Sequence, residues 1–157
     1  MHTVRTFIVF ADYFQFVVQD ENAEDDFATI WTEDALAAQT AFGQSAVCPG
    51  TLRNVDVPVE IVVAEGDPHV SLEDVDHAVE GSIEVSSGRL VVMSCTGYLP
   101  DAPRIEVEPG TYRALAVMSG IDSIETEWEP ADDKYTVYLW LGAARPPKLL
   151  KHWKGDA

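Results

Sequence analysis

The sequence predicts an all-β fold: an antiparallel β-sandwich of about seven or eight strands with one short helix. Three observations predict this class. Apolar and polar residues alternate over many short segments, turn signals rich in Gly and Pro separate most of these segments, and helical periodicity is almost absent. Because strands with one apolar face need a second layer to cover it, we expect two packed sheets.

The N-terminal region contributes two strand-like runs, VRTFIVF and DYFQFVV. They are either separate strands or one long strand with a bend near Asp12. Phe14, Phe16 and Val18 alternate along the second run, so we expect all three on one core-facing side.

A short helix and a regular strand are predicted next. TEDALAAQ predicts a helix because Thr32 can cap it and acidic residues follow in its first turn. In NVDVPVEIVV every second residue is apolar, and Pro58 lies on the opposite face. Proline cannot donate to a neighbouring strand, so this strand is expected at a sheet edge. LEDVDHAV begins either as a loop or as a helical turn capped by Ser71.

The second half predicts antiparallel pairs. HAVEGSIEV alternates, and SSG at 86–88 then turns the chain into RLVVMSC, which predicts a hairpin. RIEVE and TYRALAVM flank Pro109 and Gly110, which are expected as the central residues of a type II turn between two more antiparallel strands. DKYTVYLWLG predicts the last strand.

The chain is strongly acidic. Its 157 residues include 10 basic and 27 acidic ones, which give a formal net charge of -17. That charge repels phosphate groups, so we expect no direct binding of nucleic acid and no binding to anionic membranes. It suits metal cations or a basic protein partner, whereas general solubility or adaptation to salt is the alternative explanation. The first residues do not resemble a cleaved signal peptide, so we expect a cytoplasmic protein.

The C-terminal segment has the opposite charge, with four basic residues and one acid over 145–157. Pro146 and Pro147 end the preceding strand. Leu149, Leu150 and Trp153 then form an apolar patch with near-helical spacing, which can pack on the body or on a second subunit. We therefore predict a β-sandwich domain over residues 1–144 and a basic tail over 145–157, with a homodimer as one alternative assembly.

Neither of the two cysteines, Cys48 and Cys95, belongs to a recognisable motif, and we expect both to be reduced, buried small hydrophobic residues. The chain has no nucleophile elbow and no glycine-rich phosphate loop after a strand. Its one mixed cluster of metal-binding residue types matches no known ligand pattern: His69, Glu73, Asp74, Asp76 and His77. We therefore predict a protein that is not an enzyme, with no catalytic residues, no metal and no cofactor.

Two acidic concentrations are the candidate binding sites, one after the second strand and one before the last. The second includes a tryptophan, and aromatic residues supply burial while acids steer a basic partner. The alternatives are a solvated or calcium-binding loop for the first concentration and an inward-facing Trp128 for the second. The candidate partner-binding residues are Asp20, Glu21, Glu24, Asp25, Asp26, Asp122, Glu125, Glu127, Trp128, Glu129, Asp132 and Asp133.

Four segments in order, DYFQFVVQD, WTEDA at 31–35, PGTYR at 109–113 and YTVYLW at 135–140, resemble the competence protein J family of small acidic bacterial nuclease inhibitors. In layout the resemblance covers most of the chain, but the basic and apolar tail departs from it. The resemblance implies a β-sandwich and an inhibitor or immunity-like role, since the type member binds and blocks a nuclease of the competence system.

Residues and resemblance together predict a non-enzymatic module that binds a basic protein, such as a nuclease, through acidic loops. A nuclease site is positive because it holds phosphates, so carboxylates on a rigid scaffold can occupy it. Two alternatives stay open. One is a sandwich that binds a cation or small molecule, including an enzyme with loop carboxylates, and the other is a structural homo-oligomer.

Overall fold

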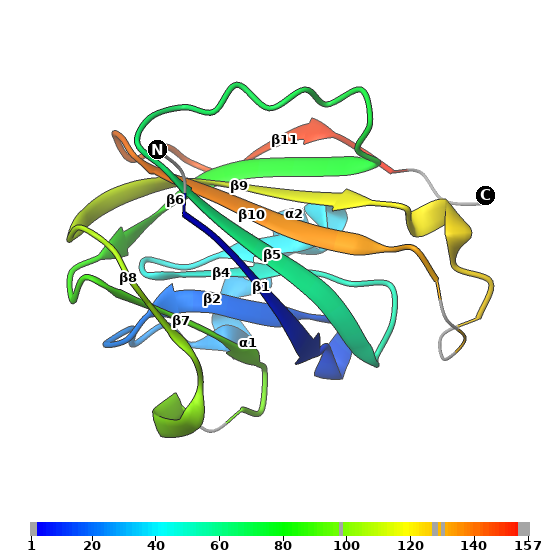
Figure 1. Cartoon of the computed structure of the whole chain (residues 1–157), viewed down its shortest axis with the longest axis horizontal. Helices are drawn as coiled ribbons and strands as arrows, with labels where there is room; N and C mark the ends of the chain where they lie inside the picture. The colour runs from blue at the N-terminus through cyan, green and yellow to red at the C-terminus, as the bar shows by residue number, and fades with distance from the viewer. Residues whose placement is uncertain (1–2, 98, 127–128, 130, 154–157) are drawn as a thin grey trace.

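The structure is a computed structural model that describes residues 3–97, 99–126, 129 and 131–153 (Figure 1). The strands are β1 (Thr3–Phe10), β2 (Phe16–Asp20), β3 (Thr40–Phe42), β4 (Ala46–Pro49), β5 (Asp56–Ala64), β6 (His77–Val85), β7 (Arg89–Ser94), β8 (Arg104–Glu106), β9 (Gly110–Ser119), β10 (Lys134–Leu141) and β11 (Lys148–Lys151). Two short α-helices, α1 (Phe27–Ile30) and α2 (Glu33–Ala38), and three 3-10 turns, η1 (Asp12–Phe14), η2 (Leu99–Asp101) and η3 (Ile121–Ser123), complete the described chain.

The strands form two sheets packed face to face. One has the order β1-β5-β10-β9-β6-β11 and the other β3-β4-β2-β7-β8, and the pairing is antiparallel except between β5 and β10. The all-β sandwich predicted from the sequence is confirmed. No helix in the described part of the chain is long and apolar enough to cross a membrane.

The main core lies between the two sheets. Phe16 of β2 and Tyr135 of β10 meet edge to face across it, with ring centroids 6.3 Å apart, and both are fully buried. Large aliphatic side chains such as Ile61 and Leu90 fill the space around them, and each buried side chain of this size contributes about 1.5–3 kcal/mol. As predicted, Phe16 and Val18 face this core.

A second apolar layer explains why β2 is buried along its whole length. On the other face of the five-stranded sheet, Val17 and Cys48 pack with Ile30 and Ala35, which α1 and α2 carry. Helix α2 begins as predicted: the Thr32 hydroxyl accepts a hydrogen bond from the Ala35 N–H at 3.2 Å. Helix α1 was not predicted, and the alternative helical turn over LEDVDHAV does not form.

Two predicted hairpins are wrong. Strands β6 and β7 belong to different sheets, and so do β8 and β9, so the turns at 86–88 and 109–110 carry the chain between sheets. Gly110 has a φ of 156° instead of the roughly +80° of a type II turn. A glycine-rich turn serves a corner between sheets as well as a hairpin, and alternation identifies the buried face of a strand but not its neighbour.

Two expectations about strand placement are also corrected. Strands β1 and β2 lie in different sheets, so the alternative of one long bent strand is wrong. The strand with Pro58 is not at an edge, because β5 pairs with β1 on one side and β10 on the other. Pairing with β10 begins only at Val59, opposite Tyr135, so the missing N–H of Pro58 interrupts no ladder there.

The basic tail continues the larger sheet. Residues 148–151 form β11, which pairs with β6 and places Lys148 opposite Glu80. They are therefore extended, although the spacing of Leu149, Leu150 and Trp153 is near-helical. Beyond β11, the Trp153 N–H donates to Nδ1 of His77 at 3.1 Å, and its indole N–H donates to the Asp122 carboxylate at 2.9 Å. These contacts fold the tail back onto the acidic body.

The two cysteines are free thiols, as expected. Cys48 is fully buried, and this burial raises the pKa of its thiol to about 12. Cys95 follows β7 and is partly exposed, so the prediction of burial is confirmed for Cys48 alone.

Candidate partner-binding site

The two acidic segments lie at opposite ends of the sandwich (Figure 1). Asp20, at the end of β2, bonds to Ser87 in the turn after β6, and Val85 of β6 pairs with Gly110, the first residue of β9. The second segment begins after Ser119, the last residue of β9. The length of β9 therefore separates the segments by about 30 Å, at roughly 3.3 Å per residue, and they do not form one surface.

In the first segment, Asp20 and Glu21 are used inside the fold. Asp20 is 1% exposed, and its carboxylate accepts hydrogen bonds from the N–H and hydroxyl of Ser87 at 3.0 and 2.6 Å. The two oxygens of Glu21 pair with Arg89 at 2.5 Å and Arg104 at 3.1 Å. The hydrogen bonds from Arg89 and Arg104 hold the pKa of Glu21 below its ordinary value.

The next acids also shape local structure. The Asp25 carboxylate accepts hydrogen bonds from the N–H groups of Gln44 and Ser45 at 2.6 and 2.8 Å, which holds the turn between β3 and β4. Asp26 caps α1 by accepting from the Ala28 N–H at 2.9 Å. Glu24 is exposed. These bonds, together with those of Asp20 and Glu21, stabilise this end of the fold and leave little free carboxylate there for a partner.

A buried ion pair anchors the second segment. The guanidinium of Arg53 bonds to both oxygens of Asp133 at 2.5 and 3.1 Å and to the Glu129 carbonyl at 2.9 Å. The Tyr135 hydroxyl donates to the same carboxylate at 2.9 Å. Burial, and then the negative charge of Asp133, raise the pKa of Tyr135 above its ordinary value. Asp133 is itself 1% exposed, so it positions the segment from inside.

The rest of the second segment presents carboxylates to solvent. Glu127 and Trp128, two of the predicted residues, lie outside the described residues. The tail contacts the segment through the hydrogen bond from the Trp153 indole to Asp122. Within the segment, the Asp132 N–H donates to Ser123 Oγ at 2.8 Å. The exposed acids are Asp122, Glu125, Glu129 and Asp132.

Sequence reasoning missed two aromatic residues at this end. Tyr13 is 70% exposed and Phe14, expected in the core, is 45% exposed. Both have left-handed backbone conformations, with φ of 57° and 60°, which cost on the order of 1–3 kcal/mol each. The sequence signal for this exposure is that the two aromatic residues are neighbours, because alternation can direct only one of two neighbouring side chains into the core.

Three consecutive residues connect this aromatic turn to the acidic segment. The Thr51 N–H donates to the Phe14 carbonyl at 2.8 Å, the Leu52 N–H donates to the Tyr135 hydroxyl at 3.4 Å, and Arg53 holds the Glu129 carbonyl. One end of the sandwich therefore combines two exposed aromatic rings with four exposed carboxylates. We call it the acidic end: Tyr13, Phe14, Asp122, Glu125, Glu129 and Asp132.

The cluster of metal-binding residue types is divided among other contacts. The His77 ring is buried, and the Asp76 carboxylate accepts a hydrogen bond from the Ile121 N–H at 3.1 Å. His69 lies in a loop, where its backbone N–H donates to Asp67 at 2.9 Å. Among the residues that the structure describes, no three His, Cys, Asp or Glu side chains are grouped so as to hold a metal ion.

No protein-family model matches the chain, and no curated protein sequence matches it. Two solved structures are similar. One is ComJ from Bacillus subtilis, an inhibitor of the DNA-degrading activity of NucA, with a TM-score of 0.70 and 13% identity over 90% of this chain and 99% of ComJ. The other is crocagin biosynthetic gene J, with a TM-score of 0.63 and 19% identity over 91% of this chain and 99% of its own. The chain therefore has a ComJ-like fold, and the resemblance to competence protein J is confirmed at the level of the fold.

Proposed function

We propose that this chain is a non-enzymatic binding protein that inhibits a basic enzyme of nucleic acid, such as a nuclease, by covering it with the acidic end. The observation that carries the proposal is the set of four exposed carboxylates on a loop fixed by the buried pair of Arg53 and Asp133. The fold supports the proposal. ComJ, an inhibitor of the DNA-degrading activity of NucA, has a similar fold over 90% of this chain.

The physical basis is competition with phosphate. An enzyme that binds nucleic acid presents a positive surface to hold phosphates. Carboxylates next to the anchor formed by Arg53 and Asp133 meet that surface at a reduced ordering cost, and a net charge of -17 accelerates the encounter at low ionic strength. Binding of this kind weakens as salt rises, because the charges that steer it are exposed.

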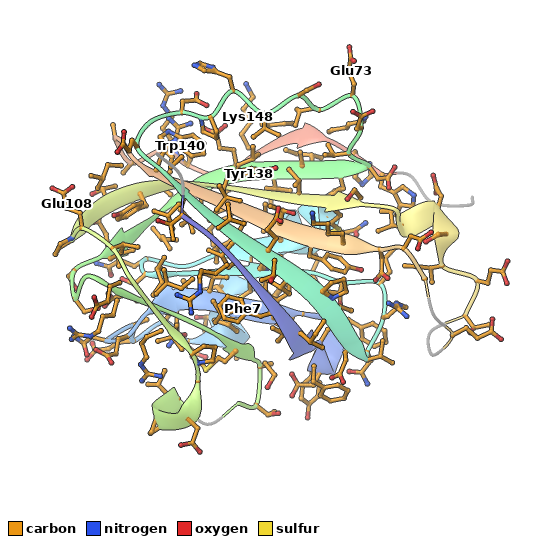
Figure 2. All side chains as sticks on the ribbon, viewed as in Figure 1. Phe7, Glu73, Glu108, Tyr138, Trp140 and Lys148 are labelled. Carbon is orange, nitrogen blue, oxygen red and sulfur yellow. The ribbon has the colours of Figure 1, made fainter. Side chains whose placement is uncertain are left out.

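The test is digestion of linear DNA by the Bacillus subtilis nuclease NucA, with and without the chain. Wild-type chain is expected to slow digestion, and the variant Glu125→Lys/Glu129→Lys is expected to lose most of this effect. The control is Glu106→Lys/Glu108→Lys, which changes the net charge equally. Glu108 lies at the opposite end of the molecule (Figure 2), and Glu106, the last residue of β8, precedes it by two residues. Equal loss in both variants would show that only net charge matters, and a wild-type chain that never slows digestion would contradict the proposal.

One observation favours a second candidate, binding of a small molecule. A hollow of about 340 Å³ lies beside Tyr13 and Phe14, which is within the size range of small-ligand sites. Screening a metabolite collection by thermal shift tests this candidate. A ligand whose stabilisation disappears on replacement of Trp31 by Ala would support it.

A further inference from the structure

Two neighbouring aromatic rings project into solvent at the turn between β1 and β2. Tyr13 and Phe14 both have positive φ, a conformation that residues other than Gly, Asn and Asp rarely adopt. Phe16, two residues later, is fully buried. The backbone strain at Tyr13 and Phe14 is therefore not offset by deep burial of their rings.

Hydrogen bonds hold this strained turn on both sides. The buried carboxylate of Asp12 accepts hydrogen bonds from the N–H groups of Cys95 and Thr96 at 2.8 and 3.2 Å and from the Thr96 hydroxyl. On the other side, the Phe14 N–H donates to the Ala11 carbonyl at 3.1 Å, and the Phe14 carbonyl accepts from Thr51. Strain that is held in this way is typical of functional sites.

An apolar hollow opens beside the turn, with Phe14, Trp31, Leu36 and Leu52 among its walls and a volume of about 340 Å³. The indole N–H of Trp31 donates to the Gln15 side chain at 2.9 Å, so the polar group of this wall is already satisfied. Leu36 is 62% exposed. The hollow thus offers apolar surface that nothing in the described chain covers.

Acidic residues adjoin the walls of the hollow on α2 and next to Leu52. Glu33 precedes Leu36 by three residues on α2, so the two share a helix face. Leu52 of the hollow wall precedes Arg53, which holds the backbone carbonyl of the exposed Glu129. The segments that line or adjoin the hollow contain one basic residue, Arg53, which is buried and paired with Asp133. These segments are 12–15, 31–39, 50–53, 129 and 131–133. Charge complementarity therefore selects a basic occupant.

We propose that Tyr13, Phe14 and the hollow form the centre of the partner interface, and that the hollow receives an apolar side chain carried on a basic loop of the partner protein. This inference rests on the proposed function, because it assigns the centre of the interface whose rim is the exposed acids. Buried aromatic anchors inside a polar rim are the usual arrangement of interface hot spots. A turn that is already rigid presents its rings without a further ordering cost.

The test uses variants that keep the turn and remove the rings. Tyr13→Gly/Phe14→Gly and Tyr13→Asn/Phe14→Asn both tolerate positive φ, so the melting temperature is expected to be unchanged or higher. A displayed library of random peptides is selected against wild-type chain, and the enriched peptides are synthesised and titrated calorimetrically. We expect peptides with Lys or Arg around a large apolar residue, and at least about tenfold weaker binding to both double variants. Ile8→Asn, which changes another exposed apolar residue, should bind like wild type.

The possible outcomes separate the two proposals. Equal peptide binding by wild type and both double variants, enrichment of peptides without basic residues, or no enrichment would overturn the inference. A double-glycine variant that inhibits NucA as well as wild type would also overturn it while leaving the proposed function intact. Peptide binding that depends on Tyr13 and Phe14, in a wild-type chain that never inhibits NucA, would support the inference and contradict the nuclease function alone.

Discussion

Asp133→Ala is expected to destabilise the fold far more than the same change at its neighbour Asp132. The side chains of Arg53 and Asp133 are 7% and 0% exposed, and two hydrogen bonds of 2.5 and 3.1 Å join them. Removal of the carboxylate leaves the guanidinium buried without its counter-charge and deprives the Tyr135 hydroxyl of its acceptor. Breaking a buried pair in this way costs about 3–5 kcal/mol, out of a total stability of about 5–15 kcal/mol.

Urea unfolding followed by circular dichroism measures this loss. Asp132→Ala is the matched control, because this side chain is exposed, and its effect should stay within about 0.5 kcal/mol. Arg53→Met/Asp133→Leu should recover much of the loss, since no charge remains buried. A loss below about 1 kcal/mol for Asp133→Ala, or a double variant that is no more stable than it, would refute the anchoring role of the pair.

Three further predictions concern the fold. Burial lowers the pKa of His77 below its ordinary value of 6.5, so the folded state favours the neutral ring. The free energy of unfolding should therefore not depend on His77 above pH 6.5. Below pH 6.5 it should fall as the pH decreases, by at most about 1.4 kcal/mol per pH unit. Because burial raises the pKa of Cys48 to about 12, iodoacetamide in native buffer should modify the partly exposed Cys95 first, as peptide mass spectrometry would show. Gly120→Ala should cost about 1 kcal/mol or more in urea unfolding, because Gly120 has a φ of 66° and an added Cβ would lie 2.1 Å from the Asp132 carbonyl oxygen.

Each of these has a direct control. His77→Gln should remove its share of the pH dependence, whereas a variant with unchanged slope below pH 6.5 would contradict a buried neutral ring. Equal modification rates for the two thiols would contradict the burial of Cys48. Gly66→Ala is the control for Gly120, because nothing lies within 4 Å of its added Cβ; equal effects at both sites would refute the close approach.

The sequence predicted single elements better than their pairing. The one-sided pattern around Val57 and Ile61 and the cap at Thr32 are local properties, and the structure confirms them. Strand order depends on contacts between distant segments, which alternation does not encode. Pro58 led to the wrong prediction of an edge strand for this reason. Its missing N–H would disrupt pairing with β10 only where β10 runs alongside it, and β10 pairs with β5 only from Val59 onward.

The same limit applies to the candidate site. Asp20 and Asp25 look like free surface acids in the sequence, but their partners are backbone and hydroxyl groups of the turns at Ser87 and Gln44, which only the fold brings near. The sequence does not indicate the exposure of Phe14, because Phe14 continues the alternation of Phe16 and Val18. In the structure the chain turns at Phe14, before the strand begins.

Hydrogen exchange of the chain alone and in complex with NucA is the sharpest test of the proposed binding surface, because it maps the covered surface without any substitution. Binding through the acidic end predicts protection of amides at 12–15, 50–53 and 121–126, and unchanged exchange at 21–26 and 104–108, at the opposite end. Protection confined to 21–26 and 104–108, with exchange at the acidic end unchanged, would contradict it.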